Sequence, residues 1–295
     1  MCADQYTRKA PSITRPRRNV VVRLCSFECS FSQPLSDPAN ANFSADLNRW
    51  AAISNRTFVW NYASNFNSFL LPFPNHYVIG PNVRFMFARG VRGLYEESTS
   101  LTGELHALKS YLIERMLWDP TADDLAIIAE FLDAFYTPRA APWVRLYMDT
   151  IHGSVADTAY YAKEWFDYTA AFLTPAALLT SADALAHAVN CTPVASRFRT
   201  RVEEVQLSVY YPILLRWQEL REFAARETLA WPLKEPTKQE ALGVFLGRLG
   251  RMEPPVTRFG SGDPGGVQHT VDWFLACVNG TWDATRPPCT LAKNS

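Results

Sequence analysis

Apolar residues follow two different spacings along the chain, and the change between them falls near residue 100. Before that point, runs of β-branched and aromatic residues predict strands at 19–27, 56–64 and 91–95. Apolar positions at helical spacing between these runs predict one helix with Ser44 as its N-cap and a second helix that ends at Gly90. This order of strands and helices predicts a parallel sheet with right-handed crossovers.

After residue 100 the apolar spacing is helical throughout. Thr121 with Asp124 forms a pair like a capping box, and Thr237 with Glu240 forms a complete one, so both pairs predict helix starts. A long helix is expected from about 195 to 228, with a kink near Pro212. Shorter helices are expected at 105–116, 125–135, 144–151 and 267–278.

The two spacings predict an α/β part followed by an all-α part. Three parallel strands alone make a poor domain, because a parallel sheet is normally covered on both faces. Either the helical part completes this sheet, or further strands lie upstream. The expected parts are a disordered basic leader at 1–17, a partial β/α barrel segment at 18–118, a helical domain at 119–260 and a turn-rich tail with a short helix at 261–295.

Composition and motifs narrow the classes of function. The 295 residues carry no net charge, so the charge balance does not indicate nucleic acid or an anionic membrane as a partner. No apolar run of about 18 residues is present, so no transmembrane helix is expected. The chain has no HExxH, Walker A, GxGxxG or GxSxG pattern and its five histidines are dispersed, so neither a metal site nor a cofactor is expected.

Cysteines and glycosylation sequons leave the cellular location open. The six cysteines are scattered, and a Cys277–Cys289 bridge and free thiols are both compatible with their spacing. Four N-x-S/T sequons occur, at Asn42, Asn55, Asn190 and Asn279. The N-terminus lacks the apolar segment of a secretory signal, so glycosylation would need a signal further upstream. Secretion of a longer protein is therefore one outcome that the sequence leaves open.

Candidate chemistry lies where the predicted strands end, which is where (β/α)8 barrels carry their functional residues. These positions hold Glu28, an aromatic and amide cluster from Trp60 to Asn65, and the pair Glu96 and Glu97. Aromatic rings pack against the C–H faces of sugars while amides and acids bond the hydroxyls, so these residue types are typical of a carbohydrate site. Glycosidase chemistry would need two carboxyl groups about 5 to 9.5 Å apart.

Each candidate also has an ordinary structural interpretation. Glu28 is compatible with a solvated or salt-bridged loop acid. Trp60 and Tyr62 share a strand face and would also suit the core of a sheet. Glu96 would be presented at the rim by a short, glycine-flanked strand, whereas Glu97 would point the opposite way, towards solvent.

Seven segments between residues 18 and 150 resemble a known family: RLCSFECSF, LNRW, FVWNYASNF, PFPN, GVRGLYEES, LKSYLIERMLWDP and EFLDAFY. The family is domain-of-unknown-function family 4838, which is related to glycoside-hydrolase barrels of the alpha-glucuronidase type. The resemblance implies that this chain corresponds to the C-terminal half of the family. It would supply the last three strands of an eight-stranded barrel, followed by a helical domain, with the earlier strands absent. The implied site-lining positions are Arg23, Glu28, Trp60, Tyr62, Asn65, Asn75 and Glu96.

The expected function is carbohydrate binding, or hydrolysis of glycosidic bonds in the full-length protein, by a chain that alone lacks a complete catalytic pair. Glu96 and Glu28 are the candidate catalytic residues. The candidate substrate-binding residues are Arg23, Trp60, Tyr62, Asn65 and Asn75. The expected partner is an oligo- or polysaccharide, with uronic-acid sugars among the candidates.

The alternative is a non-catalytic helical interaction or scaffold protein with a vestigial β/α segment. It would leave the strand edge at Val20–Leu24 open for a partner chain.

Overall fold

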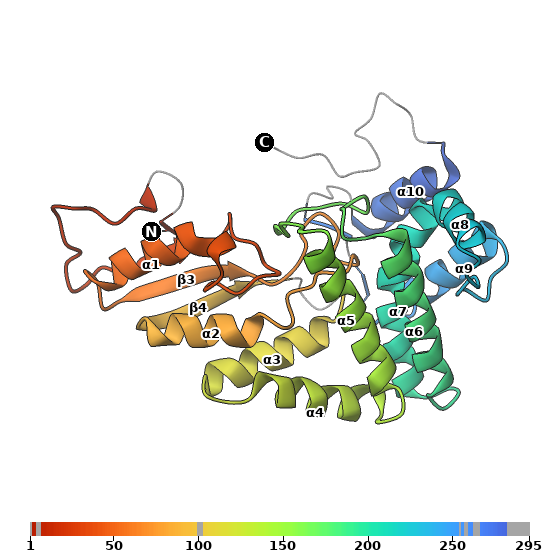
Figure 1. The fold of residues 1–295 in the computed structure, drawn as a ribbon, viewed down its shortest axis with the longest axis horizontal. Helices are drawn as coiled ribbons and strands as arrows, with labels where there is room; N and C mark the ends of the chain where they lie inside the picture. Colours follow the sequence, from red (N-terminus) through yellow and green to blue (C-terminus); the bar gives the residue numbers. More distant parts are fainter. Residues whose placement is uncertain are drawn as a thin grey trace.

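A computed structural model describes residues 2–3, 7–98, 103–253, 255–256, 259–261 and 266–281. Its β part is a parallel sheet in the order β1-β2-β3-β4. The strands are β1 (Cys2–Ala3), β2 (Val22–Cys25), β3 (Thr57–Tyr62) and β4 (Val91–Glu97). Helix α1 (Ala41–Ala51) connects β2 to β3, and α2 (Ile79–Ala88) connects β3 to β4 (Figure 1). The predicted α/β character is confirmed, and closure into a barrel stays a prediction.

The sheet has one covered face and one open face. Residues in register on neighbouring strands, such as Trp60 and Tyr95, point to the same side. Leu24 and Val59 are fully buried, in the same core cluster as residues of α1 and α2. We call their side the covered face, and it comprises Val22, Leu24, Ser26, Val59, Asn61, Leu94 and Glu96. The open face comprises Arg23, Cys25, Phe58, Trp60, Tyr62, Gly93, Tyr95 and Glu97.

Local signals placed the end of α2 correctly and the start of α1 wrongly. Gly90 follows α2 with a φ of 73°, a left-handed conformation that glycine adopts without a Cβ clash, so the predicted helix end is confirmed. Ser44 is not the N-cap, because α1 begins at Ala41. A 3-10 turn capped by the Asp37 side chain leads directly into α1, and Ser44 Oγ donates to the carbonyl of Leu35 instead.

The rest of the described chain is helical, as predicted. Its helices are α3 (His106–Trp118), α4 (Asp124–Tyr136), α5 (Ala141–Asp157), α6 (Pro175–Asn190), α7 (Arg197–Leu215), α8 (Trp217–Arg226), α9 (Lys238–Leu249) and α10 (Gly266–Asn279). Helix α6 packs against α5 and α7, and α9 packs against α7. None of the helices in the described ranges is long and apolar enough to cross a membrane.

Helix starts and breaks in this part follow side-chain capping and proline. The Thr237 capping box is confirmed, with the Glu240 side chain accepting from the Thr237 N–H at 3.1 Å. The start predicted at Thr121 is wrong, because the Asp123 carboxylate caps α4 two residues later. The kink predicted near Pro212 is a break one turn further on, at Arg216, between α7 and α8.

Part of the expected disordered leader packs against the sheet. Strand β1 pairs in parallel with Arg23 and Leu24, a pairing that two residues without periodicity could not predict. Arg8 is buried, and its carbonyl accepts from Trp50 Nε1 at 2.6 Å. Strand β1 therefore covers part of the edge at Val20–Leu24. Within the described residues, the outer strands of the sheet are β1 and β4, and each has one edge without a neighbouring strand.

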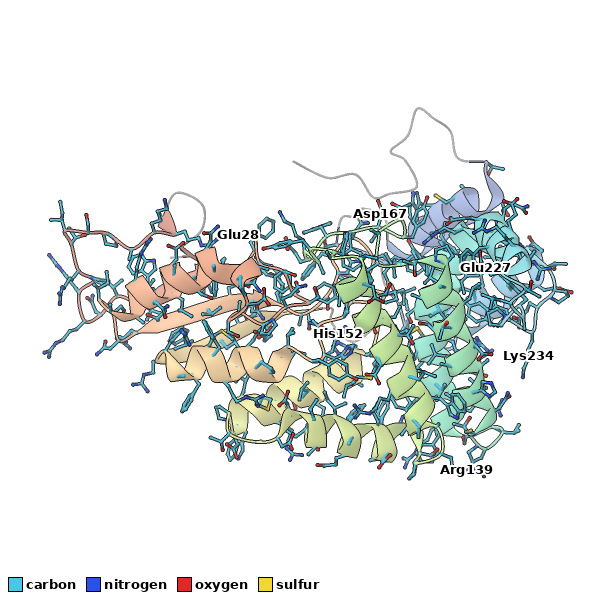
Figure 2. All side chains as sticks on the ribbon, viewed as in Figure 1. Glu28, Arg139, His152, Asp167, Glu227 and Lys234 are labelled. Atoms are coloured by element: carbon cyan, nitrogen blue, oxygen red, sulfur yellow. The ribbon has the colours of Figure 1, made fainter. Side chains whose placement is uncertain are left out.

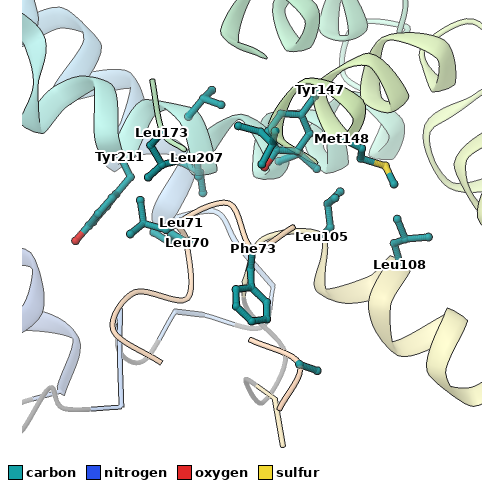
Figure 3. Close-up of a cluster of buried hydrophobic side chains, with 14 of the residues drawn as sticks. Leu70, Leu71, Phe73, Leu105, Leu108, Tyr147, Met148, Leu173, Leu207 and Tyr211 are labelled. Atoms are coloured by element: carbon teal, nitrogen blue, oxygen red, sulfur yellow. The ribbon is translucent and has the colours of Figure 1, made fainter. Parts of the chain in front are cut away.

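One continuous core joins the β part to the helical part. Phe73 from the loop after β3 lies near side chains from α3, α5 and α7 (Figure 3). At this junction Lys109 Nζ forms a buried ion pair with Glu104 Oε2 at 2.6 Å and donates to Phe73 O at 2.9 Å. Tyr147 donates to the other Glu104 oxygen at 2.8 Å. Because these buried charges are paired and hydrogen-bonded, they fix α3 and α5 to the loop after β3.

Two cysteines of the described chain are disulfide-bonded, namely Cys25 and Cys277, whereas Cys29 and Cys191 are free thiols. The predicted partner of Cys277, Cys289, lies outside the described residues.

Candidate functional site

The open face carries a stacked group of three side chains from three strands. The Arg23 guanidinium lies over the Trp60 ring, 4.6 Å from its centroid, and Tyr95 meets the same ring edge-on at 5.0 Å. Trp60 Nε1 donates to Glu97 Oε2 at 2.7 Å, which fixes the orientation of the indole. Glu97 therefore lies on the open face and bonds the strand beside it, whereas the sequence suggested a carboxylate in solvent.

Arg23 has an unusual environment for a cation in a sheet. Within the described chain the guanidinium contacts the Trp60 ring but no carboxylate within ion-pair distance, and its Nε is buried without a hydrogen-bond partner. The guanidinium is thus held by stacking, and no described residue compensates its charge with an ion pair. Such a group favours an anionic ligand, because a carboxylate can accept two parallel hydrogen bonds from it.

A second aromatic group continues this surface around the carboxyl ends of the strands. Phe27, Tyr62, Phe66 and Trp165 form a chain of rings with successive centroid distances of 5.8, 5.8 and 6.2 Å. The two end members are exposed, Phe27 at 45% and Trp165 at 38%. We call these four residues the rim aromatics. Flat rings that are packed on one side and exposed at both ends suit contact with the apolar faces of a ligand.

Glu96 lies on the covered face, at the end of a hydrogen-bonded chain. Asn61 Nδ2 donates to both Glu96 oxygens at 3.1 and 3.0 Å, and Ser26 Oγ donates to Asn61 Oδ1 at 2.6 Å. Desolvation raises the pKa of Glu96 to about 7, and the hydrogen bond from Asn61 opposes that rise. A carboxyl group with this pKa holds a proton through the weakly acidic range and can exchange it near neutrality.

Glu28 is engaged by the N-terminal segment. Its carboxylate forms an ion pair with Arg8, and Arg8 Nε is also 3.1 Å from Asp46 Oδ2. Glu28 and Arg8 line a hollow of about 600 Å³ together with residues of α1, including Asn42. In Figure 2 Glu28 lies close to α1, far from Glu227 and Lys234 in the helical part. Among the described contacts none joins Glu28 to Glu96, so the two predicted carboxylates occupy separate surroundings.

Asn65 and Asn75 are buried and hold backbone segments together. Asn65 Nδ2 donates to Phe166 O at 2.9 Å, and Asn67 Nδ2 donates to the same carbonyl at 3.1 Å. Asn75 Nδ2 donates to Ala63 O at 3.1 Å. These amides tie the loops at the rim to neighbouring backbone segments.

The segment 159–174 brings residues to the rim that the sequence did not indicate. The carbonyls of Ala162 and Glu164 accept from the amides of Phe31 and Phe66, both at 2.7 Å. Glu164 is buried, one of its carboxylate oxygens lacks a hydrogen-bond partner, and desolvation raises its pKa to about 7. No motif marks this segment, because its place depends on contacts with strand ends about a hundred residues earlier.

Metal binding has no support in the described chain. No group of three or more His, Cys, Asp or Glu side chains in the described ranges could hold a metal ion.

The residues that the sequence predicted for the site divide into three sets. Arg23, Trp60 and Tyr62 belong to the aromatic surface, Glu96 and Glu28 lie apart beneath and beside it, and Asn65 and Asn75 are buried with their side chains bonded to backbone carbonyls.

Comparison with known proteins gives one finding. The family model described as a domain of unknown function, DUF4838, matches residues 1–149, just over half of the chain. A search of curated proteins and a search of solved structures each found no match.

Proposed function

This chain belongs to the DUF4838 family, and on that premise we propose that it binds carbohydrate on the open face of its sheet. The observation that carries the proposal is the Trp60–Tyr95 pair with Arg23 stacked on it. Tyr95 is half exposed and Trp60 partly buried, and rings whose orientation is already fixed bind sugar faces at a small cost in side-chain entropy. The rim aromatics extend the same kind of surface beyond the strand ends.

The proposed ligand class includes sugars that carry a carboxylate. Arg23 has no anionic partner within ion-pair distance in the described chain, and a uronic-acid carboxylate would supply one. Neutral sugars would use the rings alone. We therefore expect an oligosaccharide with uronic-acid units to bind more tightly than its neutral counterpart.

Hydrolysis of a glycosidic bond would need more than this chain's predicted pair. Glu96, with a pKa of about 7, has the property of a general acid. Glu28 is paired with Arg8, and no described contact joins Glu28 to Glu96. In this proposal the chain binds sugar and its hydrolytic activity as an isolated chain is weak or absent.

Isothermal titration of the purified chain tests the proposal, with matched acidic and neutral oligosaccharides as ligands. Trp60→Ala and Tyr95→Ala should each weaken binding of both ligands by about tenfold or more, equivalent to about 1.4 kcal/mol. Arg23→Gln should weaken only the acidic ligand. Trp118→Ala is the matched control, because Trp118 is 92% exposed and lies outside the open face. Binding that survives all three open-face substitutions, or no binding by the parent chain, would overturn the proposal.

A second candidate function, interaction with a partner chain, is favoured by the outer edge of β4. A hollow of about 320 Å³ there is lined by α2, β4 and the end of α3, with Phe87, Leu117 and Trp118 exposed around it. Unpaired strand edges beside apolar surface are sites of β-strand addition. We propose this edge, rather than Val20–Leu24, as the place for such a partner. A chain that remains monomeric at all concentrations in light scattering, and whose solubility Trp118→Ala does not change, would count against it.

A further inference from the structure

The four sequon asparagines are exposed at the surface, whereas most other asparagines of the described chain are buried. Asn42, Asn55, Asn190 and Asn279 are all exposed. The buried asparagines of the described chain are Asn40, Asn61, Asn65, Asn67, Asn75 and Asn82, and none of them starts a sequon. Exposure is therefore not a general property of asparagine in this fold, although Asn19 and Asn48 are exposed as well and start no sequon.

Hydrogen bonds donated by the side-chain amide nitrogen distinguish the sequon asparagines from the buried ones more clearly. Nδ2 is the atom that a glycan would occupy, and no hydrogen bond from it is found within the described residues for any of the four sequon asparagines. Asn190 has only its oxygen engaged, by Lys234 Nζ at 3.4 Å. By contrast, five of the six buried asparagines donate from Nδ2: Asn40, Asn61, Asn65, Asn67 and Asn75. Substitution at Nδ2 would thus leave the internal hydrogen bonds of the fold intact.

The positions of the four side chains also leave the proposed sugar-binding face clear. Asn190 and Asn279 are the last residues of α6 and α10, and Asn55 lies in the loop between α1 and β3. Asn42 is on the first turn of α1 and lines the hollow that holds Glu28. None of the four belongs to the open face of the sheet.

Disulfide bonding adds an independent observation. Cys25 and Cys277 are disulfide-bonded, and such bonds persist in oxidising compartments, which are also where asparagine-linked glycans are added. Asn279 lies two residues after one of these cysteines. The disulfide-bonded cysteines therefore favour a compartment in which exposed sequons are also modified.

We propose that Asn42, Asn55, Asn190 and Asn279 are acceptor sites for asparagine-linked glycans. The donor is an oligosaccharide carried on a lipid diphosphate. A bond forms between Nδ2 and C1 of the first sugar, and the bond from C1 to the diphosphate oxygen breaks. The lipid diphosphate leaves with that electron pair, and the amide nitrogen loses one proton. The proposal stands independently of carbohydrate binding by the open face.

The test is expression of the full chain behind a secretion signal in a eukaryotic cell, with the total cell and medium protein analysed. Treatment with an amidase that removes asparagine-linked glycans should collapse a series of slower gel bands to one. The same treatment converts each modified asparagine to aspartate, which peptide mass spectrometry reads site by site. Asn42→Gln, Asn55→Gln, Asn190→Gln and Asn279→Gln should each remove one glycan from the fully modified form.

Asn48→Gln is the matched control, because Asn48 is exposed on α1 but starts no sequon, and it should leave the band pattern unchanged. A site whose peptide is recovered only as unmodified asparagine is overturned, and four such sites overturn the proposal. Analysis of total protein keeps this outcome readable when little chain is secreted, because glycans are added on entry to the compartment. Sugar binding by the deglycosylated chain is measured separately, so the two proposals succeed or fail independently.

Discussion

The two faces of one sheet differ in burial and in chemistry, although the same strands, β2, β3 and β4, build them. The covered face carries apolar side chains that are completely buried, such as Leu24 and Val59. The open face carries Phe58 and Tyr95 with 37% and 51% of their surface exposed. Apolar burial accounts for stability on one side, and the exposed rings on the other gain little from folding. Substitutions on the two faces should therefore separate stability from binding.

The largest effect is expected on the covered face, from Leu24→Ala. Removing a fully buried leucine side chain loses its transfer free energy and leaves a cavity, so the free energy of unfolding should fall by about 2 to 5 kcal/mol. Urea denaturation followed by far-UV circular dichroism measures this change. A loss below about 1 kcal/mol would mean that β2 is not packed as described.

Glu96→Gln should stabilise the protein, and only at higher pH. The folded-state pKa of about 7 lies above the ordinary value of 4.5, so the folded protein binds more protons than the unfolded chain between these values. The contribution of this group to the free energy of unfolding therefore falls as pH rises from about 4.5 to 7. Above pH 7 the ionised carboxylate destabilises the folded state by its full amount. The variant should match the parent near pH 4.5 and exceed it by about 1 to 3 kcal/mol at pH 8. Urea denaturation at both pH values checks this, and equal stability at pH 8 would contradict it.

Gly93→Ala tests how closely the strands approach on the open face. A Cβ at Gly93 would lie 2.4 Å from Cε2 of Phe58, so the Phe58 ring would have to move. The single substitution should cost about 1 to 3 kcal/mol. In the double variant Gly93→Ala with Phe58→Ala, the clash is gone and the two costs should not add. Additive costs in denaturant unfolding would contradict this contact.

The smallest effect on stability should come from Tyr95→Ala. The side chain is half exposed, so its loss should change the free energy of unfolding by only about 0.5 kcal/mol. The same variant is expected to weaken sugar binding by about tenfold, which unfolding curves and titration calorimetry together would show. A large loss of stability with unchanged binding would reverse the assignment of the two faces.

Local sequence signals predicted those parts of the fold that depend on near neighbours. The three longer strands, the Gly90 helix end and the Thr237 capping box were all readable from a few adjacent residues. Thr121 failed because Asp123 caps α4 instead, and Ser44 failed because α1 continues directly from a 3-10 turn that Asp37 caps. Competition between equivalent polar residues cannot be resolved from spacing alone.

The candidate site was predicted where strand register determines it. Arg23 and Trp60 are brought together by the parallel pairing of β2 with β3, which follows from the order of elements. Trp165 and Glu164 were missed, because the hydrogen bonds that place their segment join residues about a hundred positions apart, as from Asn65 to Phe166. The internal hydrogen bonds of Asn65 could not be predicted either, since its residue type suits a ligand and a backbone carbonyl equally, and its role towards a ligand stays a prediction.

The bonds between segment 159–174 and the strand ends have a consequence for hydrogen exchange. The amides of Phe31 and Phe66 bond to carbonyls only two residues apart, at Ala162 and Glu164, although they belong to different loops. Any opening that lifts this short stretch exposes both amides to water at once. The two loops should therefore exchange with one common free energy of opening, as a single cooperative unit that also carries Trp165.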